Sequence, residues 1–98
     1  MVQEQGRIVV TVRIPADRET IERAALELPG VYEEVIDRAR AHGMISHLRV
    51  HRAGETMDID EWPSQAVHER FAADVHPLLE QLRAVRGVGP ATVEIWYP

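Results

Sequence analysis

Cysteine is absent from the 98-residue sequence, which excludes disulfide bonds and thiolate chemistry. Basic residues are also few. The 11 Lys and Arg residues stand against 16 Asp and Glu residues, and the net charge of -5 argues against a nucleic-acid partner. No stretch reaches the ~20 apolar residues of a membrane span, and residues 1–6 lack the pattern of a signal peptide. We therefore expect a cytoplasmic protein that binds neither nucleic acid nor membranes.

The remaining composition is that of a globular protein, with 45% hydrophobic and 28% charged residues. A chain of this length suits one domain, so we expect residues 1–98 to form a single domain. The core of such a small domain is modest, and association with a second copy would add to it.

Four segments have the alternating pattern or the β-branched composition of strands. They are residues 7–14, 44–52, 55–62 and 91–97. Pro15 ends the first of them, because proline interrupts strand pairing. The two residues 53–54, Ala-Gly, suit a tight turn between the second and the third.

Two helical segments separate these strands, each with an apolar stripe at helical spacing. The first begins after Asp17, a suitable N-cap, is interrupted at residues 29–30 (Pro-Gly), and stops at Gly43. The second begins after Ser64, and Pro77 inside it predicts a bend or a break. The order β-α-β-β-α-β predicts an α+β ferredoxin-like fold with a four-stranded antiparallel sheet.

Right-handed crossovers place both helical segments on one face of such a sheet, and the other face is bare in a monomer. For each strand we assign to the bare face the side turned away from the aliphatic residues. This face then carries Val9, Thr11, Arg13, His47, Arg49, His51, Thr56, Asp58, Asp60, Trp62, Thr92, Glu94 and Trp96.

Two tryptophans on this otherwise polar face favour burial, because tryptophan is common where apolar area is buried beside polar groups. We expect a homodimer through this face, with a polar, partly water-filled space between the two sheets. The alternative is a monomer with scattered surface aromatics.

The tight turn at residues 53–54 also fixes which residues of the hairpin lie opposite each other. It pairs Arg49 with Asp58, and His47 with Asp60, with Cβ atoms roughly 5 Å apart. A shift of one residue would destroy both pairs, so their coherence supports this register.

The stretch 51–55, followed by residues 60–64 and Phe71, resembles the hairpin and helix start of the antibiotic-biosynthesis-monooxygenase-like proteins. Residues 87–94 are similar to the end of small actinobacterial members. The resemblance spans nearly the whole chain and implies the dimeric α+β barrel. Some of these proteins oxygenate polyketide quinols without metal or flavin. Others isomerise lactones, degrade haem or cyclise polyketides, and many have no known activity, so the fold does not choose the reaction.

Our preferred prediction is a cofactor-independent monooxygenase-like enzyme acting on a small aromatic or polyketide-like molecule between the sheets. His47 and Asp60 would handle the proton, and Arg49 and Arg13 the anionic oxygen. The residues expected to contact the substrate are Arg13, His51, Asp58, Trp62, Glu94 and Trp96.

Other interpretations remain open. His47–Asp60 and Arg49–Asp58 could be purely structural pairs in a non-catalytic homodimer that binds a ligand or has a filled interior. An isomerase or a polyketide cyclase would use the same base without oxygen uptake. We expect no metal site, since His47 and His51 lie about 13 Å apart along one strand. Haem held by one histidine stays an alternative.

Overall fold

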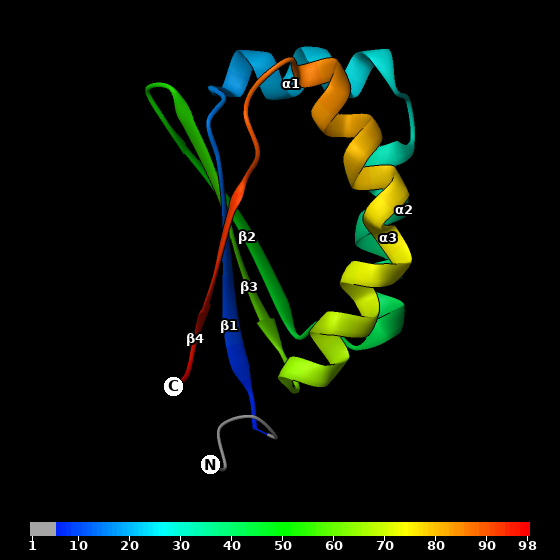
Figure 1. Cartoon of the computed structure of the whole chain (residues 1–98), viewed down its shortest axis with the longest axis vertical. Coiled ribbons are helices and arrows are strands. Elements are labelled where there is room, and N and C mark those ends of the chain that lie inside the picture. The colour runs from blue at the N-terminus through cyan, green and yellow to red at the C-terminus, as the bar shows by residue number, and fades with distance from the viewer. Residues whose placement is uncertain (1–5) are drawn as a thin grey trace.

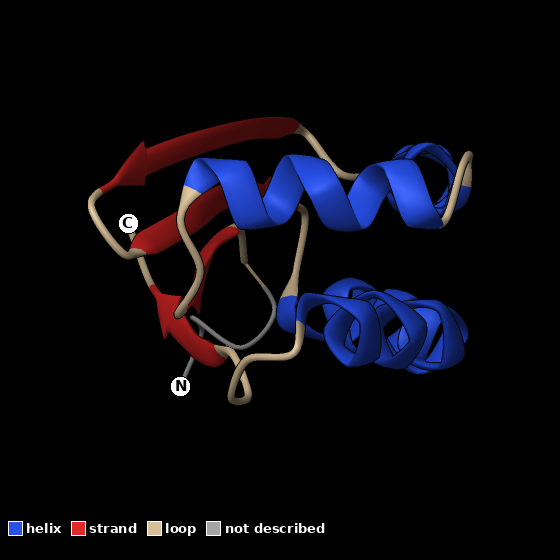
Figure 2. Ribbon diagram, turned by 90° about the horizontal axis from the view of Figure 1, so that it is seen from above, coloured by secondary structure: helices blue, strands red, loops and turns tan. Residues whose placement is uncertain are grey.

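Four strands form one antiparallel sheet in the order β2-β3-β1-β4 in the computed structural model, which describes residues 6–98. Their bounds are β1 Ile8–Ile14, β2 Ser46–Arg52, β3 Glu55–Trp62 and β4 Thr92–Trp96. Three helices, α1 Arg18–Glu27, α2 Val31–His42 and α3 Gln65–Arg86, lie on one side of this sheet (Figures 1 and 2). The predicted α+β ferredoxin-like fold is confirmed.

The helix boundaries follow the predicted capping signals. Asp17 Oδ1 accepts a hydrogen bond from the backbone N–H of Thr20 at 2.9 Å, which caps α1. Gly30 has φ 83° and separates α1 from α2. Gly43, with φ 108°, ends α2 in the left-handed conformation that favours glycine. Ser64 Oγ accepts from the N–H of Val67 at 3.2 Å and caps α3.

Of the bend or break expected at Pro77, the break is absent, because α3 runs through this residue without interruption. Proline removes one backbone hydrogen bond, but packing holds the turns on either side. Val75 and Leu82 are buried against Val35 of α2. Tertiary contacts thus outweigh the local cost, and the helix curves over the sheet (Figure 1).

The core lies between the sheet and the helices. Ile8 and Val10 of β1 pack there with Ala39 of α2 and Trp62 of β3. Trp62 is 1% exposed and is the largest of the fully buried side chains. Because the large apolar side chains of β1 point toward the helices, the residues opposite them on β3 share that direction.

This register overturns our assignment of the bare face. Val10 lies opposite Asp60 and Val12 opposite Asp58, so the carboxylates point toward the helices. His47, Arg49 and His51 of β2 lie opposite Asp60, Asp58 and Thr56 and share this face. The polar space is therefore between the sheet and the helices of one chain, and not between two sheets.

The side of the sheet that faces away from the helices is more apolar than expected. Leu48 and Val50 of β2 are 57% and 37% exposed there, and Trp96 of β4 is 53% exposed. Val9, Met57 and Ile59 also lie on this side of the sheet, which we call the open sheet face. The sequence assigned it correctly on β1 and β4, and wrongly on β2 and β3.

The expectation that no signal peptide is present rests mainly on residues 1–5, which lie outside the described part of the chain. Within residues 6–98, no helix is both long enough and apolar enough to span a membrane.

Candidate active site

A cavity of about 390 Å³ lies between the sheet and helices α2 and α3. Most of its wall is apolar, with aliphatic residues such as Val12, Ile36 and Leu79. Polar side chains from the adjacent strands β2 and β3 line one region of it, and they include His47 and Asp60. An apolar pocket with a few convergent polar groups is the usual form of a small-molecule site.

Three side chains from three elements form a hydrogen-bonded chain in the cavity wall. Nδ1 of His47 lies 2.5 Å from Oδ1 of Asp60, and Nε2 lies 2.9 Å from the hydroxyl of Tyr32 on α2. An ionised carboxylate only accepts hydrogen bonds, so we assign the imidazole proton to Nδ1. Nε2 then accepts from the Tyr32 hydroxyl. His47 is thus held in one tautomer, as a general base requires.

Burial governs the charge of the groups beside His47. It raises the pKa of Tyr32, with the carboxylates of Asp58 and Asp60 adding to the effect, so this phenol is neutral at pH 7. Burial also raises the pKa of Asp60, although its contact with His47 acts in the opposite direction. Asp60 is therefore more basic than an exposed aspartate, which favours a shared proton.

Arg49 and Asp58 form the second polar pair. The guanidinium donates from Nε to Oδ1 at 2.6 Å and from Nη2 to Oδ2 at 2.8 Å. This bidentate geometry orders both side chains, which are 17% and 13% exposed. The same guanidinium lies 4.5 Å from the centre of the Tyr32 ring. Arg49 therefore fixes the ring whose hydroxyl contacts His47.

An aromatic group closes the part of the cavity nearest the start of α3. The ring of Trp62 lies 4.8 Å from that of Phe71 and 5.3 Å from that of His68. Burial lowers the pKa of His68, so this imidazole is neutral at pH 7. Within residues 6–98, the buried Nε1 of Trp62 has no hydrogen-bond partner. This wall suits a flat organic ligand.

The structure brings together five of the predicted site residues. They are His47, Arg49, Asp58, Asp60 and Trp62, and all line the cavity. Both predicted cross-strand pairs are present as hydrogen-bonded contacts.

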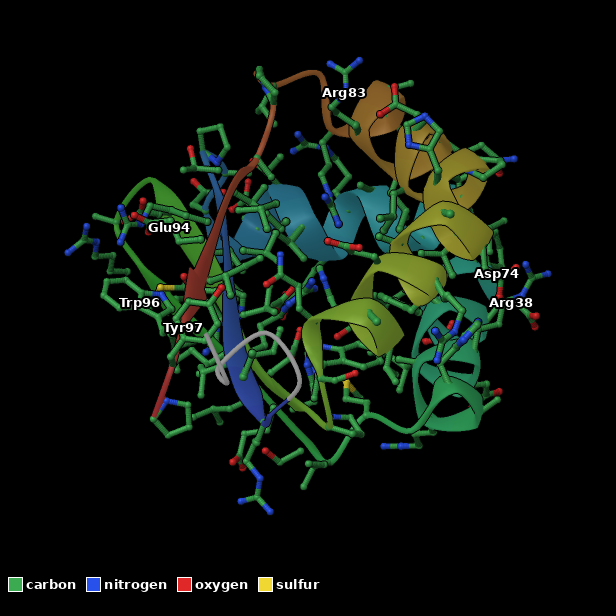
Figure 3. All side chains as sticks on the ribbon, turned by 60° about the horizontal axis from the view of Figure 1, so that its bottom comes forward. Arg38, Asp74, Arg83, Glu94, Trp96 and Tyr97 are labelled. Atoms are coloured by element: carbon green, nitrogen blue, oxygen red, sulfur yellow. The ribbon has the colours of Figure 1, made fainter. Side chains whose placement is uncertain are left out.

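Three other predicted residues lie on the open sheet face, away from this cavity. Arg13 forms an ion pair with Glu55 at 3.1 Å. Glu94 and Trp96 project from β4 on the side opposite the helices (Figure 3). Nε1 of Trp96 donates to the hydroxyl of Thr11 at 2.9 Å. None of these residues can contact a ligand that His47 contacts, because the sheet separates them.

His51 points to the helix side but lines smaller hollows at the hairpin end of the sheet. Its Nδ1 lies 2.8 Å from the hydroxyl of Thr56, which itself donates to the carbonyl of Ala16 at 2.9 Å. This contact supports a structural role for His51, which does not line the main cavity.

Sequence reasoning missed Tyr32, His68 and Arg86, which line the cavity from the helices. A signal for Tyr32 existed, because it precedes Val35 and Ile36 by three and four residues and so shares their face of α2. Within the described residues, no group of three or more His, Cys, Asp or Glu side chains is arranged to hold a metal ion.

Neither a protein-family model nor a curated protein sequence matches this chain significantly. Solved structures do match it along nearly its whole length. An antibiotic biosynthesis monooxygenase superposes with a TM-score of 0.69 at 20% identity, covering 93% of this chain and 97% of the other. The chain has the fold of the antibiotic biosynthesis monooxygenases.

Two further structures extend this likeness. SnoaB, a cofactor-independent oxygenase from Streptomyces nogalater, has a TM-score of 0.64 at 14% identity, covering 94% of this chain and 92% of its own. A dimeric ferredoxin-like protein from an uncultured marine organism has a TM-score of 0.69 at 15% identity, covering 98% and 90%. The fold resemblance predicted from the sequence is confirmed. Sequence identities this low show a shared fold and do not show a shared function.

Proposed function

We propose that this protein is a cofactor-independent, monooxygenase-like enzyme that removes a proton from a small aromatic or polyketide-like substrate. The observation that carries the proposal is the chain Tyr32–His47–Asp60, which borders a largely apolar cavity of about 390 Å³. A base oriented by a carboxylate in such a cavity serves proton abstraction better than it serves stability.

The proposed roles follow from the geometry. His47 accepts the substrate proton at Nε2, either directly or through the hydroxyl of Tyr32, and Asp60 stabilises the imidazolium that forms. Arg49 donates to Asp58 through Nε and Nη2, so its Nη1 edge is left for the developing phenolate or enolate oxygen. Trp62 and Phe71 supply the apolar surface for the ring.

Such a reaction balances without a cofactor. Deprotonation turns a phenol or its keto tautomer into an electron-rich anion, which is the form that transfers electrons to O₂. One oxygen atom replaces the two hydrogens of a methylene group as a carbonyl, and the other leaves with those hydrogens as water. The substrate supplies all the electrons. SnoaB, with this fold, is a cofactor-independent oxygenase, which supports the proposal by analogy.

We also propose a homodimer through the open sheet face. Leu48 and Val50 of β2 and Trp96 of β4 expose apolar area at the two edges of this face, and Val9, Met57 and Ile59 lie on the strands between them. A contiguous apolar surface of this kind marks an interaction site more often than a free surface. The ferredoxin-like protein of similar fold is dimeric, which supports a dimer by analogy. In this arrangement each chain keeps its own cavity, behind its own sheet.

The function is tested by oxygen uptake with a panel of anthrones, naphthols and hydroquinones, measured with an oxygen electrode and by product mass. We expect His47→Gln to lower turnover by about 100-fold or more. His42→Gln is the matched control, since His42 also contacts an aspartate, Asp74 at 3.0 Å, but on the outer surface of the helices.

Turnover without oxygen uptake would replace the oxygenase with an isomerase or a cyclase that uses the same base. A panel in which compounds raise the melting temperature but none is turned over would favour the non-catalytic ligand-binding homodimer. Full turnover by His47→Gln would remove that residue from the mechanism.

A further inference from the structure

Arg86, the last residue of α3, presents an unusual cation to the cavity. It lines the main cavity together with Tyr32 and Arg49. Within residues 6–98 it forms no ion pair, and its Nε is buried without a hydrogen-bond partner. A partly buried guanidinium with a buried, unpartnered Nε and no carboxylate partner is costly, and such groups are retained in proteins mainly where they bind something.

The other arginines around the cavity have partners. Arg49 is engaged by Asp58 in a bidentate pair. Arg83, one turn before Arg86, pairs with Glu80 at 3.1 Å and is about half exposed. It extends outward from the end of α3 (Figure 3). Arg86 is thus the cavity arginine whose charge the described part of the chain leaves unneutralised.

Its surroundings add to this excess of positive charge. Burial lowers the pKa of Arg86, and the neighbouring charge of Arg49 lowers it further, while Asp58 acts in the opposite direction. Asp58 is already bound by Arg49, and Asp60 is turned to His47. Two guanidinium groups therefore share one carboxylate in this part of the cavity.

There is space beside Arg86 for a ligand group. A second hollow, of about 200 Å³, borders α1 and shares four lining residues with the main cavity. They are Tyr32, Arg49, Leu82 and Arg86. Glu22 lines this second hollow but forms no ion pair with Arg86. The guanidinium thus lies at the boundary of two spaces.

We infer that the ligand of this cavity carries a carboxylate group, which Arg86 binds beside the free Nη1 edge of Arg49. Guanidinium groups match the planar, two-oxygen geometry of a carboxylate, and an apolar cavity selects the organic body that bears it. The inference rests on the proposed function and narrows its substrate class, from aromatic or polyketide-like molecules to aromatic or polyketide-like acids.

The test compares a charged and a neutral version of one probe. The probes are 6-hydroxy-2-naphthoate and 6-hydroxy-2-naphthamide, titrated by calorimetry into the wild-type protein, Arg86→Met and Arg83→Met. We expect the acid to bind the wild type at least tenfold more tightly than the amide. Arg86→Met should abolish this preference, and Arg83→Met should keep it.

Stability supplies a second measurement, which also shows that the variant folds. Removing an unpaired, partly buried cation should leave the ligand-free melting temperature of Arg86→Met equal to or above that of the wild type. Equal binding of acid and amide by the wild type, binding of neither, or an unchanged preference in Arg86→Met would overturn the inference.

These outcomes are separate from failure of the proposed function. Binding of the probe requires no turnover, so an acid preference lost in Arg86→Met would stand even if no compound consumed oxygen. Conversely, turnover of uncharged naphthols that depends on His47, without any acid preference, would support the enzyme and reject the carboxylate.

Discussion

The hydroxyl of Tyr32 lies 2.9 Å from Nε2 of His47, so the base of the cavity is already hydrogen-bonded on both of its nitrogens. A substrate proton can reach His47 only if the Tyr32 hydroxyl moves aside or passes the proton on. In both cases Tyr32 takes part in the first step. Its ring is held by the guanidinium of Arg49 at 4.5 Å, which limits its movement and favours the relay.

Tyr32→Phe is expected to lower turnover by about 100-fold, because it removes the relay and keeps the ring. The free energy of unfolding should fall by only about 1 kcal/mol, the value of one hydrogen bond. Steady-state kinetics and urea unfolding measure the two effects. Tyr97→Phe is the control, since its hydroxyl donates to Gln65 at 2.9 Å on the surface. Turnover that rises in Tyr32→Phe would show that the hydroxyl blocks the base.

Asp60→Asn should affect stability and activity differently as the pH changes. Burial raises the pKa of Asp60 in the folded protein above its ordinary value of 3.8, so folding favours the protonated carboxyl. The stability gained from the protonated carboxyl is fully present below the ordinary pKa of 3.8, and it is lost as the pH rises through the raised pKa of the folded protein. The wild type should therefore lose stability relative to Asp60→Asn as the pH rises above 3.8.

Unfolding by urea at a series of pH values measures this difference, and groups that titrate alike in both proteins cancel. We expect the activity of Asp60→Asn to fall at every pH, because the amide does not stabilise the imidazolium of His47. A difference in stability that does not change with pH would show that Asp60 titrates as an exposed carboxylate.

The local features of the fold were readable from the sequence. Asp17, Gly43 and Ser64 set helix ends by capping chemistry, which acts over three or four residues. The residues 53–54 fixed the hairpin register, and with it the His47–Asp60 contact. Each of these signals depends on residues that are close together in the sequence, so each can be read without knowing the tertiary structure.

Which face of the sheet the polar residues occupy was not readable. Alternation shows that Asp58 and Asp60 share a side of β3, but the direction of that side depends on pairing with β1. Our assignment assumed that aliphatic sides always meet the helices. Here Leu48 and Val50 face away, because the helix side holds a cavity in place of a packed core. A functional cavity is where such an assumption is expected to fail.

The Arg49–Asp58 pair predicts a clear difference between single and double substitutions. Arg49→Met or Asp58→Val alone leaves one buried charge without its partner, and each should cost about 3 kcal/mol in the free energy of unfolding. The double variant should recover most of this loss, since it removes both charges. A double-mutant cycle in urea measures the coupling.

Arg38→Met is the matched control for this cycle, because Arg38 also forms two carboxylate contacts, with Glu34 at 2.8 Å and with Asp74 at 3.1 Å, but on the surface. Figure 3 shows Arg38 and Asp74 on the outer side of the helices. Solvent screens such pairs, so we expect little change in stability. Additive effects of the two cavity substitutions would show that Arg49 and Asp58 do not stabilise each other.

The proposed homodimer predicts that a charge placed on the open sheet face separates the chains. Leu48 is 57% exposed in the single chain, and in a symmetric dimer a Leu48→Asp substitution places two carboxylates in the interface. Burial of these charges should raise the dissociation constant by about 100-fold or more, which corresponds to about 2.7 kcal/mol.

Sedimentation velocity across micromolar concentrations measures this change. Leu26→Asp is the matched control, because Leu26 is 80% exposed but lies on α1, away from the open sheet face. A wild type that sediments as a monomer would contradict the homodimer, and so would an unchanged dimer in Leu48→Asp. Each cavity lies behind its own sheet, so a monomeric Leu48→Asp variant that keeps its fold should still bind ligand.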